Sequence, residues 1–155
     1  MPSLDWVLPG RLAVGPFPRL TQPLVDEGVS AVLSLTEERE GPLPADLAER
    51  CRWDRVPLTD FDAIGERPLT SDDFERCVAI LRAWAVEGET IYVHCMAGHG
   101  RSPVVCMAYC CVVAGQPLCE AIWRVRQARP YACPSARSLA ALCRYVLSTP
   151  HAAVL

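Results

Sequence analysis

The pattern of apolar and polar residues divides the chain into strand-like and helical segments. Short apolar or alternating runs predict β-strands at residues 6–15, 30–36, 51–58 and 88–94. The first run is expected to form two strands around Pro9-Gly10. Apolar residues at helical spacing, bounded by capping residues, Gly or Pro, predict helices. These cover residues 22–27, 45–50, 70–86, 102–114, 117–128 and 135–147, with polar loops at 37–44 and 59–69.

The order of these elements predicts the fold class. The strand at 30–36 is apolar on both faces, which is typical of a strand inside a parallel sheet. Strands alternate with helices up to residue 94, and only helices follow. We therefore expect an α/β fold with a central, mostly parallel sheet flanked by helices. Ligands of such sheets bind at the carboxyl ends of strands, where residues 94–102 are expected to lie.

The segment HCMAGHGRS at residues 94–102 has the features of a phosphate-binding loop. Two glycines allow the backbone to curl so that successive N–H groups point inward, and the following helix adds its positive dipole end. The planar guanidinium of Arg101 matches phosphate oxygens. The predicted phosphate-binding residues are Met96, Ala97, Gly98, His99, Gly100 and Arg101.

Cys95 is the candidate nucleophile at the base of this loop. Inward N–H groups, a helix N-terminus and Arg101 all favour a thiolate, which is the reactive form of cysteine. Ser102 is placed to hydrogen-bond the sulfur and to help it leave. Strand alternation turns His94 away from Cys95, so we expect His94 to orient the loop through its backbone. The alternative is a buried thiol on a turn with an ordinary surface arginine, and the combination of residues favours catalysis.

HCMAGHGRS resembles the signature loop of the cysteine-dependent protein tyrosine phosphatase superfamily. That signature is His-Cys, five residues, Arg, then Ser or Thr, between a strand and a helix. Segments 5–20, 31–38, 56–61 and 74–147 are similar to the small atypical, VH1-like dual-specificity phosphatases. The resemblance implies hydrolysis of phosphotyrosine and of phosphoserine or phosphothreonine through a phosphocysteine intermediate. It implies no metal or other cofactor.

The resemblance also indicates where to look for the general acid. In this family a loop aspartate protonates the leaving oxygen, and the Asp-Phe pair of the family matches Asp60-Phe61 in LTDFDAIG. Asp62 stays open as an alternative, because an extended backbone would place both carboxylates on one side. Thr59 stands where relatives commonly have proline.

A polar residue after an Arg-Pro element is a further family feature. Pro134-Ser135 offers it here, so Ser135 is a candidate for supporting the loop. The same residue is equally suited to be the N-cap of the last helix. Arg129, of the Arg-Pro element itself, is expected to support the packing of the loop.

Composition limits the possible settings of this chemistry. The 155 residues fit one domain, 1–155, and a net charge of −3 gives no basic field for nucleic acid or anionic lipid. The apolar run at 104–115 is too short to span a bilayer, and the first residues lack the pattern of a secretory signal. Nine cysteines, mostly within apolar helical patterns, indicate a reducing compartment and no disulfide scaffold. No spacing typical of a zinc site occurs.

We therefore expect a cytoplasmic, monomeric enzyme that acts on a phosphoprotein or a small phosphomonoester. A non-protein phosphate is the first alternative: a phosphoinositide, an inositol phosphate or an RNA 5′-phosphate. Loops that bind polyanionic head groups tend to carry lysines, whereas Met96, Ala97 and His99 offer only one titratable cation. A non-catalytic phosphate-binding module, and arsenate reduction or sulfur transfer on a similar loop, are the remaining alternatives.

Overall fold

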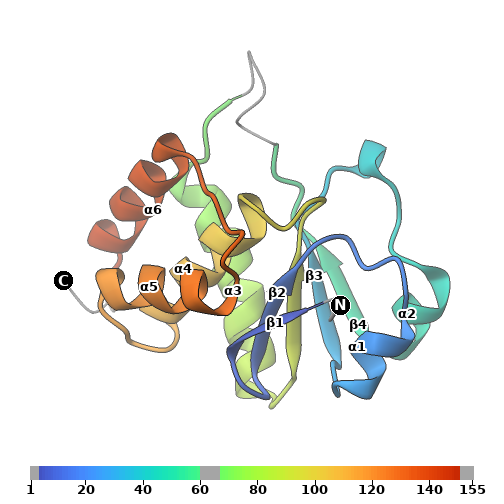
Figure 1. Cartoon of the computed structure of the whole chain (residues 1–155). Coiled ribbons are helices and arrows are strands. Elements are labelled where there is room, and N and C mark those ends of the chain that lie inside the picture. Colours follow the sequence, from blue (N-terminus) through green and yellow to red (C-terminus); the bar gives the residue numbers. More distant parts are fainter. Residues whose placement is uncertain (1–3, 60–66, 151–155) are drawn as a thin grey trace.

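A single five-stranded sheet organises the computed structural model, which describes residues 4–59 and 67–150 (Figure 1). The strands are β1 (Asp5–Leu8), β2 (Leu12–Gly15), β3 (Ala31–Ser34), β4 (Arg52–Arg55) and β5 (Ile91–His94). Their order in the sheet is β1-β2-β5-β3-β4. The β1–β2 pair is antiparallel, as the expected turn at Pro9-Gly10 requires, and the other three pairs are parallel. The prediction of a mostly parallel sheet is confirmed.

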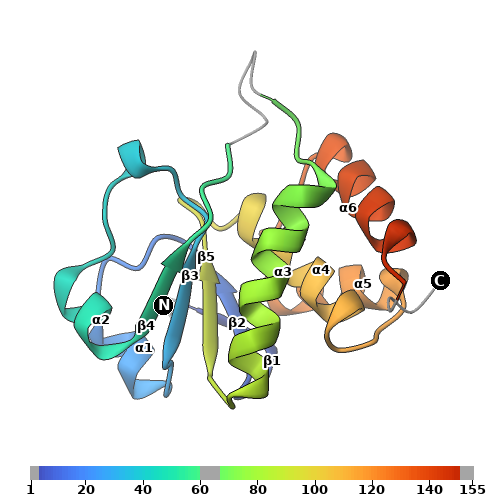
Figure 2. The same ribbon diagram turned by 180° about the vertical axis from the view of Figure 1, so that it is seen from behind.

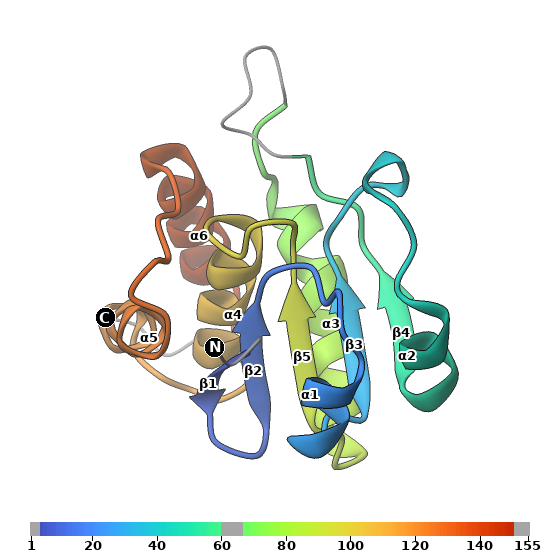
Figure 3. The same cartoon turned by 45° about the vertical axis from the view of Figure 1, so that its right-hand side comes forward.

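Helices cover both faces of the sheet, so the α/β prediction is confirmed as well (Figures 2 and 3). α1 and α2 lie against one face, and the other four helices lie against the opposite face. The helices are α1 (Gln22–Asp26), α2 (Ala45–Arg50), α3 (Ser71–Val86), α4 (Arg101–Val112), α5 (Leu118–Ala128) and α6 (Ala136–Ser148). The loop expected at 37–44 contains a short 3₁₀ helix, η1 (Glu38–Glu40).

The central strand β5 contributes to both apolar layers. Ile91 and Val93 belong to the larger core cluster beneath α3–α6, whereas Tyr92 belongs to the cluster beneath α1 and α2. Side chains alternate across a strand, and each face of β5 meets a different layer of helices. The residues that follow β5 therefore leave the sheet from its best-anchored strand.

α4 is the central helix of the larger layer. All twelve of its residues are buried, and it packs against α3, α5, α6 and β2. A helix that is apolar all round belongs in the interior, which explains the apolar run around residues 104–112. Cys106, Cys110 and Cys111 are among these buried residues, in keeping with their place in an apolar helical pattern. Of the helices in the described parts of the chain, none is both long and apolar enough to cross a membrane.

Two reciprocal hydrogen bonds form a capping box at the start of α3, and its acid is buried. Thr70 Oγ1 accepts from Asp73 N (3.2 Å), and the Asp73 carboxylate accepts from Thr70 N (2.9 Å). Asp73 is only 2% exposed and also pairs with Arg67 and Arg76. Burial alone would raise its pKa, but these hydrogen bonds lower it far below the ordinary value. The start of α3 is thus held by an ionised, buried carboxylate.

Three parallel strands end at one edge of the sheet. Gly15 of β2 and Ser34 of β3 are both in register with His94 of β5. The loop that carries the candidate nucleophile begins directly after His94. It lies above the carboxyl ends of these strands and leads into α4 (Figure 3).

Candidate active site

The loop between β5 and α4 is held in place by hydrogen bonds to five successive backbone carbonyls. Each carbonyl of residues 95–99 accepts a hydrogen bond from a group that lies around the loop. The five bonds run from His94 Nδ1 to Cys95 O (2.9 Å), Phe17 N to Met96 O (2.9 Å), Arg129 Nη2 to Ala97 O (3.0 Å), Arg129 Nε to Gly98 O (2.6 Å) and Cys133 N to His99 O (2.7 Å).

This pattern fixes the direction of the next five N–H groups. In a trans peptide the C=O and the following N–H point in opposite directions, and the described chain has no cis peptide bond. Carbonyls turned outward therefore turn the N–H groups of residues 96–100 toward the inside of the loop. Such a row of amides forms an anion-binding nest, and the N-terminus of α4 adds its positive dipole end. The inside of the loop is suited to a phosphate group.

Only one of the two loop glycines is required by the backbone geometry. Gly98 has a φ of +73°, and a Cβ there would lie 2.6 Å from Gly15 C and 2.7 Å from both Pro16 N and Arg129 Nη2. Any side chain at this position would collide with two neighbouring segments. Gly100 has a φ of −122° and open space around a built Cβ.

The Cys95 sulfur is buried and lies next to a hydroxyl. Its exposed fraction is 3%, and Ser102 Oγ lies 3.3 Å from Cys95 Sγ. Ser102 Oγ also lies 3.2 Å from the carbonyl oxygen of Gly15. The hydroxyl has one proton, which it can give to Gly15 when the sulfur is a thiol and to the sulfur when it is a thiolate. Ser102 is thus placed to stabilise the reactive form of Cys95.

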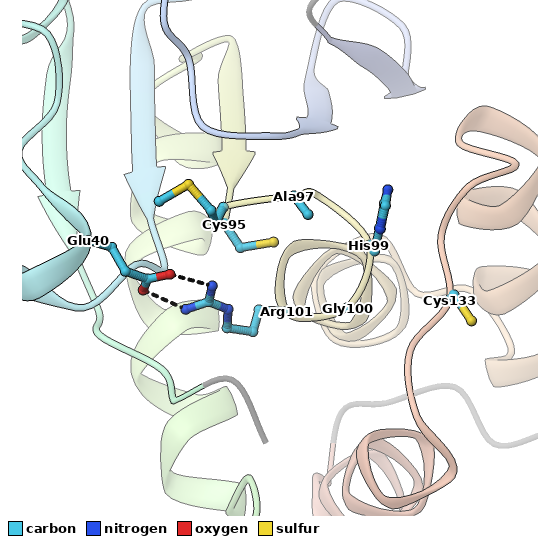
Figure 4. A pocket seen from close by; sticks show the side chains of 8 residues that line it. Glu40, Cys95, Ala97, His99, Gly100, Arg101 and Cys133 are labelled. Carbon is cyan, nitrogen blue, oxygen red and sulfur yellow. Dashed lines mark hydrogen bonds and ion pairs between the residues drawn. The ribbon is translucent and has the colours of Figure 1, made fainter. Parts of the chain in front are cut away.

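Arg101 is held in place by a carboxylate that the sequence did not predict. Its Nη1 and Nη2 bond the two oxygens of Glu40 at 2.8 Å each, and Nη1 also donates to the carbonyl of Leu58 (3.0 Å) (Figure 4). Glu40 comes from η1, in a polar loop with no regular pattern. The bonds from Arg101 lower the pKa of Glu40 against the opposing effect of burial. The ion pair fixes the plane of the guanidinium.

These groups enclose a cavity of about 320 Å³. Glu40 lies on one side of it and Cys133 on the opposite side (Figure 4). Its lining residues are Glu40, Cys95, Met96, Ala97, His99, Gly100, Arg101 and Cys133. Within residues 4–59 and 67–150, no group of three or more His, Cys, Asp or Glu residues could hold a metal ion.

The remaining predicted site residues are placed in different ways. Ser135 is the N-cap of α6, where its hydroxyl accepts from Ser138 N (3.2 Å), and it is not part of the cavity lining. Cys133, two residues earlier, lines the cavity in its place. Asp60 and Asp62 lie outside the described residues.

His94 points away from the cavity and is fully buried. Its Nδ1 bonds the Cys95 carbonyl, its Nε2 lies 2.6 Å from Ser34 Oγ, and its ring meets the edge of Phe17. Burial lowers the pKa of His94 to about 4, although the bond to Cys95 opposes this effect. A neutral ring therefore bonds the loop backbone, and the orienting role of His94 stays a prediction.

Arg129 binds the loop as a fork from the end of α5. Besides the carbonyls of Ala97 and Gly98, it binds Asp5 of β1 through Nη1 (2.8 Å). A planar guanidinium can reach all three acceptors at once, which an ammonium group cannot do. The packing role expected for Arg129 is thus specific: it turns two of the five carbonyls outward.

Comparisons with known proteins point to one family. Residues 14–147 match the family model described as the dual specificity phosphatase catalytic domain. Mouse dual specificity phosphatase 28 is 32% identical over 135 residues, covering 87% of this chain and 78% of that protein. The Arabidopsis thaliana phosphatidylglycerophosphate phosphatase PTPMT2 is 29% identical over 115 residues, covering 74% of this chain and half of that protein. The crystal structure of Tk-PTP in the active form superposes with a TM-score of 0.78 at 27% identity, covering 93% and 96% of the two chains.

Replacing Arg129 with lysine should weaken phosphate binding. The Arg129→Lys variant keeps the charge but loses the fork that holds two carbonyls, so the N–H groups of Gly98 and His99 are no longer fixed. We expect the affinity for inorganic phosphate, measured by calorimetry, to fall by roughly tenfold. Arg126→Lys, at an exposed position of the same helix, is the matched control and should bind as the wild type does. Equal affinities for both variants would contradict the role given to Arg129.

The buried His94 should make the fold sensitive to acid. The unfolded chain takes up a proton near pH 6.5, whereas folded His94 does so only near pH 4. The unfolded state therefore binds more protons between these values, and the free energy of unfolding falls as the pH falls. From this group we expect a loss of about 2 kcal/mol between pH 7 and pH 5, measured by urea denaturation. The His94→Asn variant should lack this component, and an unchanged pH dependence would contradict the assignment.

Proposed function

Since the chain belongs to the dual specificity phosphatase family and is a phosphoric monoester hydrolase, we propose that it dephosphorylates phosphotyrosine and phosphoserine or phosphothreonine in proteins. The outward-turned carbonyls of residues 95–99 carry this proposal. They leave a row of N–H donors around the buried sulfur of Cys95, beside the guanidinium of Arg101. A nucleophile at the base of an anion nest is the arrangement that phosphoryl transfer to sulfur needs.

In the first step, the Cys95 thiolate attacks phosphorus in line with the leaving oxygen. The S–P bond forms as the bond from phosphorus to the substrate oxygen breaks, giving a phosphocysteine. The N–H groups of residues 96–100 and Arg101 hold the equatorial oxygens, where negative charge must be stabilised in the transition state. Glu40 supports this step by keeping the guanidinium of Arg101 in one plane.

Proton transfer is assigned to Asp60. It protonates the leaving oxygen in the first step and, as a carboxylate again, activates the water that cleaves the S–P bond. Support for this assignment comes from the Asp60-Phe61 pair and its resemblance to the family, with Asp62 as the alternative. Ser102 then gives its proton in a hydrogen bond to the departing thiolate, at the sulfur–oxygen separation of 3.3 Å.

The charge of the cavity favours a singly phosphorylated substrate. The lining pairs Arg101 with the carboxylate of Glu40, and the whole chain contains fifteen arginines and no lysine. A head group with several phosphates would find little charge to compensate it among these lining residues. This favours phosphorylated side chains over inositol polyphosphates.

A lipid phosphomonoester is the second candidate. The similarity to an enzyme named phosphatidylglycerophosphate phosphatase supports it, and such a head group also has a single phosphomonoester. We place it second because the chain is more similar, over more of both lengths, to mouse dual specificity phosphatase 28.

The proposed setting of the enzyme follows from its composition. We propose a single catalytic domain that acts as a monomer in the cytoplasm and does not bind nucleic acid. The net charge of −3 supports the last point. The nine cysteines are free thiols, six of them buried, and buried unpaired thiols suit a reducing compartment.

The substrate class can be tested with matched phosphomonoesters. We expect higher kcat/KM for phosphotyrosine and phosphothreonine peptides than for vesicles that contain phosphatidylglycerophosphate or phosphatidylinositol 5-phosphate, measured as released phosphate. The Cys95→Ser variant should lose at least 10³-fold with every substrate, because a hydroxyl is a far weaker nucleophile. Preference for the vesicles would support the lipid candidate, and wild-type turnover by Cys95→Ser would exclude the phosphocysteine route.

The two loop aspartates can be separated by their alanine variants. Asp60→Ala should reduce kcat for an alkyl phosphate by roughly 10²- to 10⁴-fold, since its leaving oxygen needs a proton. The kcat of this variant for an aryl phosphate with a strongly acidic phenol as leaving group should fall much less. Asp62→Ala is the matched control and should stay near the wild-type rate. A larger loss in Asp62→Ala would exchange the two roles.

A further inference from the structure

A buried chain of hydrogen bonds joins the first carbonyl of the catalytic loop to the outer strand β4. Trp53 Nε1 donates to Ser34 Oγ (2.9 Å), Ser34 Oγ lies 2.6 Å from His94 Nε2, and His94 Nδ1 lies 2.9 Å from the Cys95 carbonyl oxygen. Ser34 and His94 are 0% exposed, whereas Trp53 is 38% exposed at the edge of the sheet. The chain thus crosses from β4 through β3 to β5.

The two ends of this chain determine every proton in it. The indole N–H of Trp53 can only donate, and the carbonyl of Cys95 can only accept. Ser34 Oγ therefore accepts from the indole and gives its own proton to His94 Nε2. The proton of the neutral imidazole is then on Nδ1, where it bonds the Cys95 carbonyl.

We propose that Trp53 and Ser34 are positioning residues of the phosphatase: they hold His94 as the Nδ1–H tautomer, which turns the Cys95 carbonyl outward and the Met96 N–H toward the bound phosphate. The proposal rests on the proposed function of the loop. None of the three side chains touches the reacting atoms, since His94 points away from the cavity and Ser34 and Trp53 lie beyond it.

The indole N–H supports this direction, because it takes one of the two lone pairs of Ser34 Oγ and leaves the hydroxyl proton for His94 Nε2. Without it, both lone pairs are available and Ser34 Oγ accepts a proton from His94 Nε2 more readily. His94 Nδ1 would then present a lone pair to the Cys95 carbonyl, and two acceptors would face each other. The Cys95–Met96 peptide would lose the bond that orients it, and a donor to the phosphate would lose its direction.

The ring of Trp53 has a separate contact, which allows the N–H to be tested by itself. The Arg55 guanidinium carbon lies 5.5 Å from the centre of the ring, and Arg55 Nη2 donates to the carbonyl of Gly41, next to Glu40. Phenylalanine at position 53 keeps a ring for Arg55 to stack on. Trp53→Phe therefore removes the donor while leaving the support of the Glu40 segment in place.

Nitrogen-15 NMR of the imidazole rings reads the tautomer directly in the folded wild-type protein. We expect the signals of His94 to show a protonated Nδ1 and an unprotonated Nε2, and Trp53→Phe to show a mixture or the reverse. Ser34→Ala, which removes the hydroxyl between the two rings, is the second variant. A wild-type His94 protonated on Nε2 would overturn the proposal without any substitution.

Kinetics test the consequence for catalysis. We expect kcat/KM for an aryl phosphate to fall by about tenfold in Trp53→Phe and in Ser34→Ala, and the double variant to fall no further, since both act through His94. Trp123→Phe, at an exposed position on α5, is the control and should keep the wild-type rate. Unchanged kcat/KM in Trp53→Phe, or additive losses in the double variant, would overturn the proposal. An inactive wild type with the expected tautomer would refute the proposed function instead.

Discussion

The hydrogen bonds that turn five consecutive carbonyls outward are the constraint on which the candidate active site depends. Peptide amides bind an anion only if each peptide plane is turned the right way, and short glycine-containing loops have many other conformations. Here the plane of each peptide from residue 95 to 99 is set by a separate hydrogen bond. The donors come from β5, from the segment after β2, from the end of α5 and from the segment before α6. The fold brings these four regions together around one strand end.

The positive charge of Arg101 is balanced by Glu40, which also supports the site from outside the reacting atoms. Arg101 is almost fully buried, and a buried guanidinium without a partner would be costly. The two carboxylate oxygens of Glu40 provide that partner. They fix the plane of the guanidinium and compensate its positive charge. In the function that we propose, a dianion is bound through oriented dipoles and this one cation. A chain with a net charge of −3 needs no general positive surface for this task.

The sequence predicted what depends on local pattern and missed what depends on contacts between distant segments. Strands, helices and the catalytic loop follow from periodicity, capping residues and the spacing of Cys95 and Arg101, and all lie close to where they were expected. Glu40 was missed because it lies 61 residues from its partner, in a loop whose acidic residues all look alike. The contact behind the role proposed for Trp53 was missed as well, because strand alternation predicts the face on which a side chain lies but not the partner of its N–H. Ser135 is the opposite case. Its sequence position suits an N-cap, and its observed contact is that of the N-cap of α6.

The five hydrogen bonds that hold the carbonyls of the catalytic loop, here called its clamps, also have a consequence for folding. Their donors range from Phe17 to Cys133, and the Asp5–Arg129 pair spans 124 residues. Contacts of such high sequence separation close late, after most of the chain entropy has been lost. A nascent chain that has emerged only as far as α4 already contains Cys95 and Arg101 but lacks three of the five clamps. Under the proposed function, the row of inward N–H groups around the thiol is complete only when the segments after α4 have folded onto the loop.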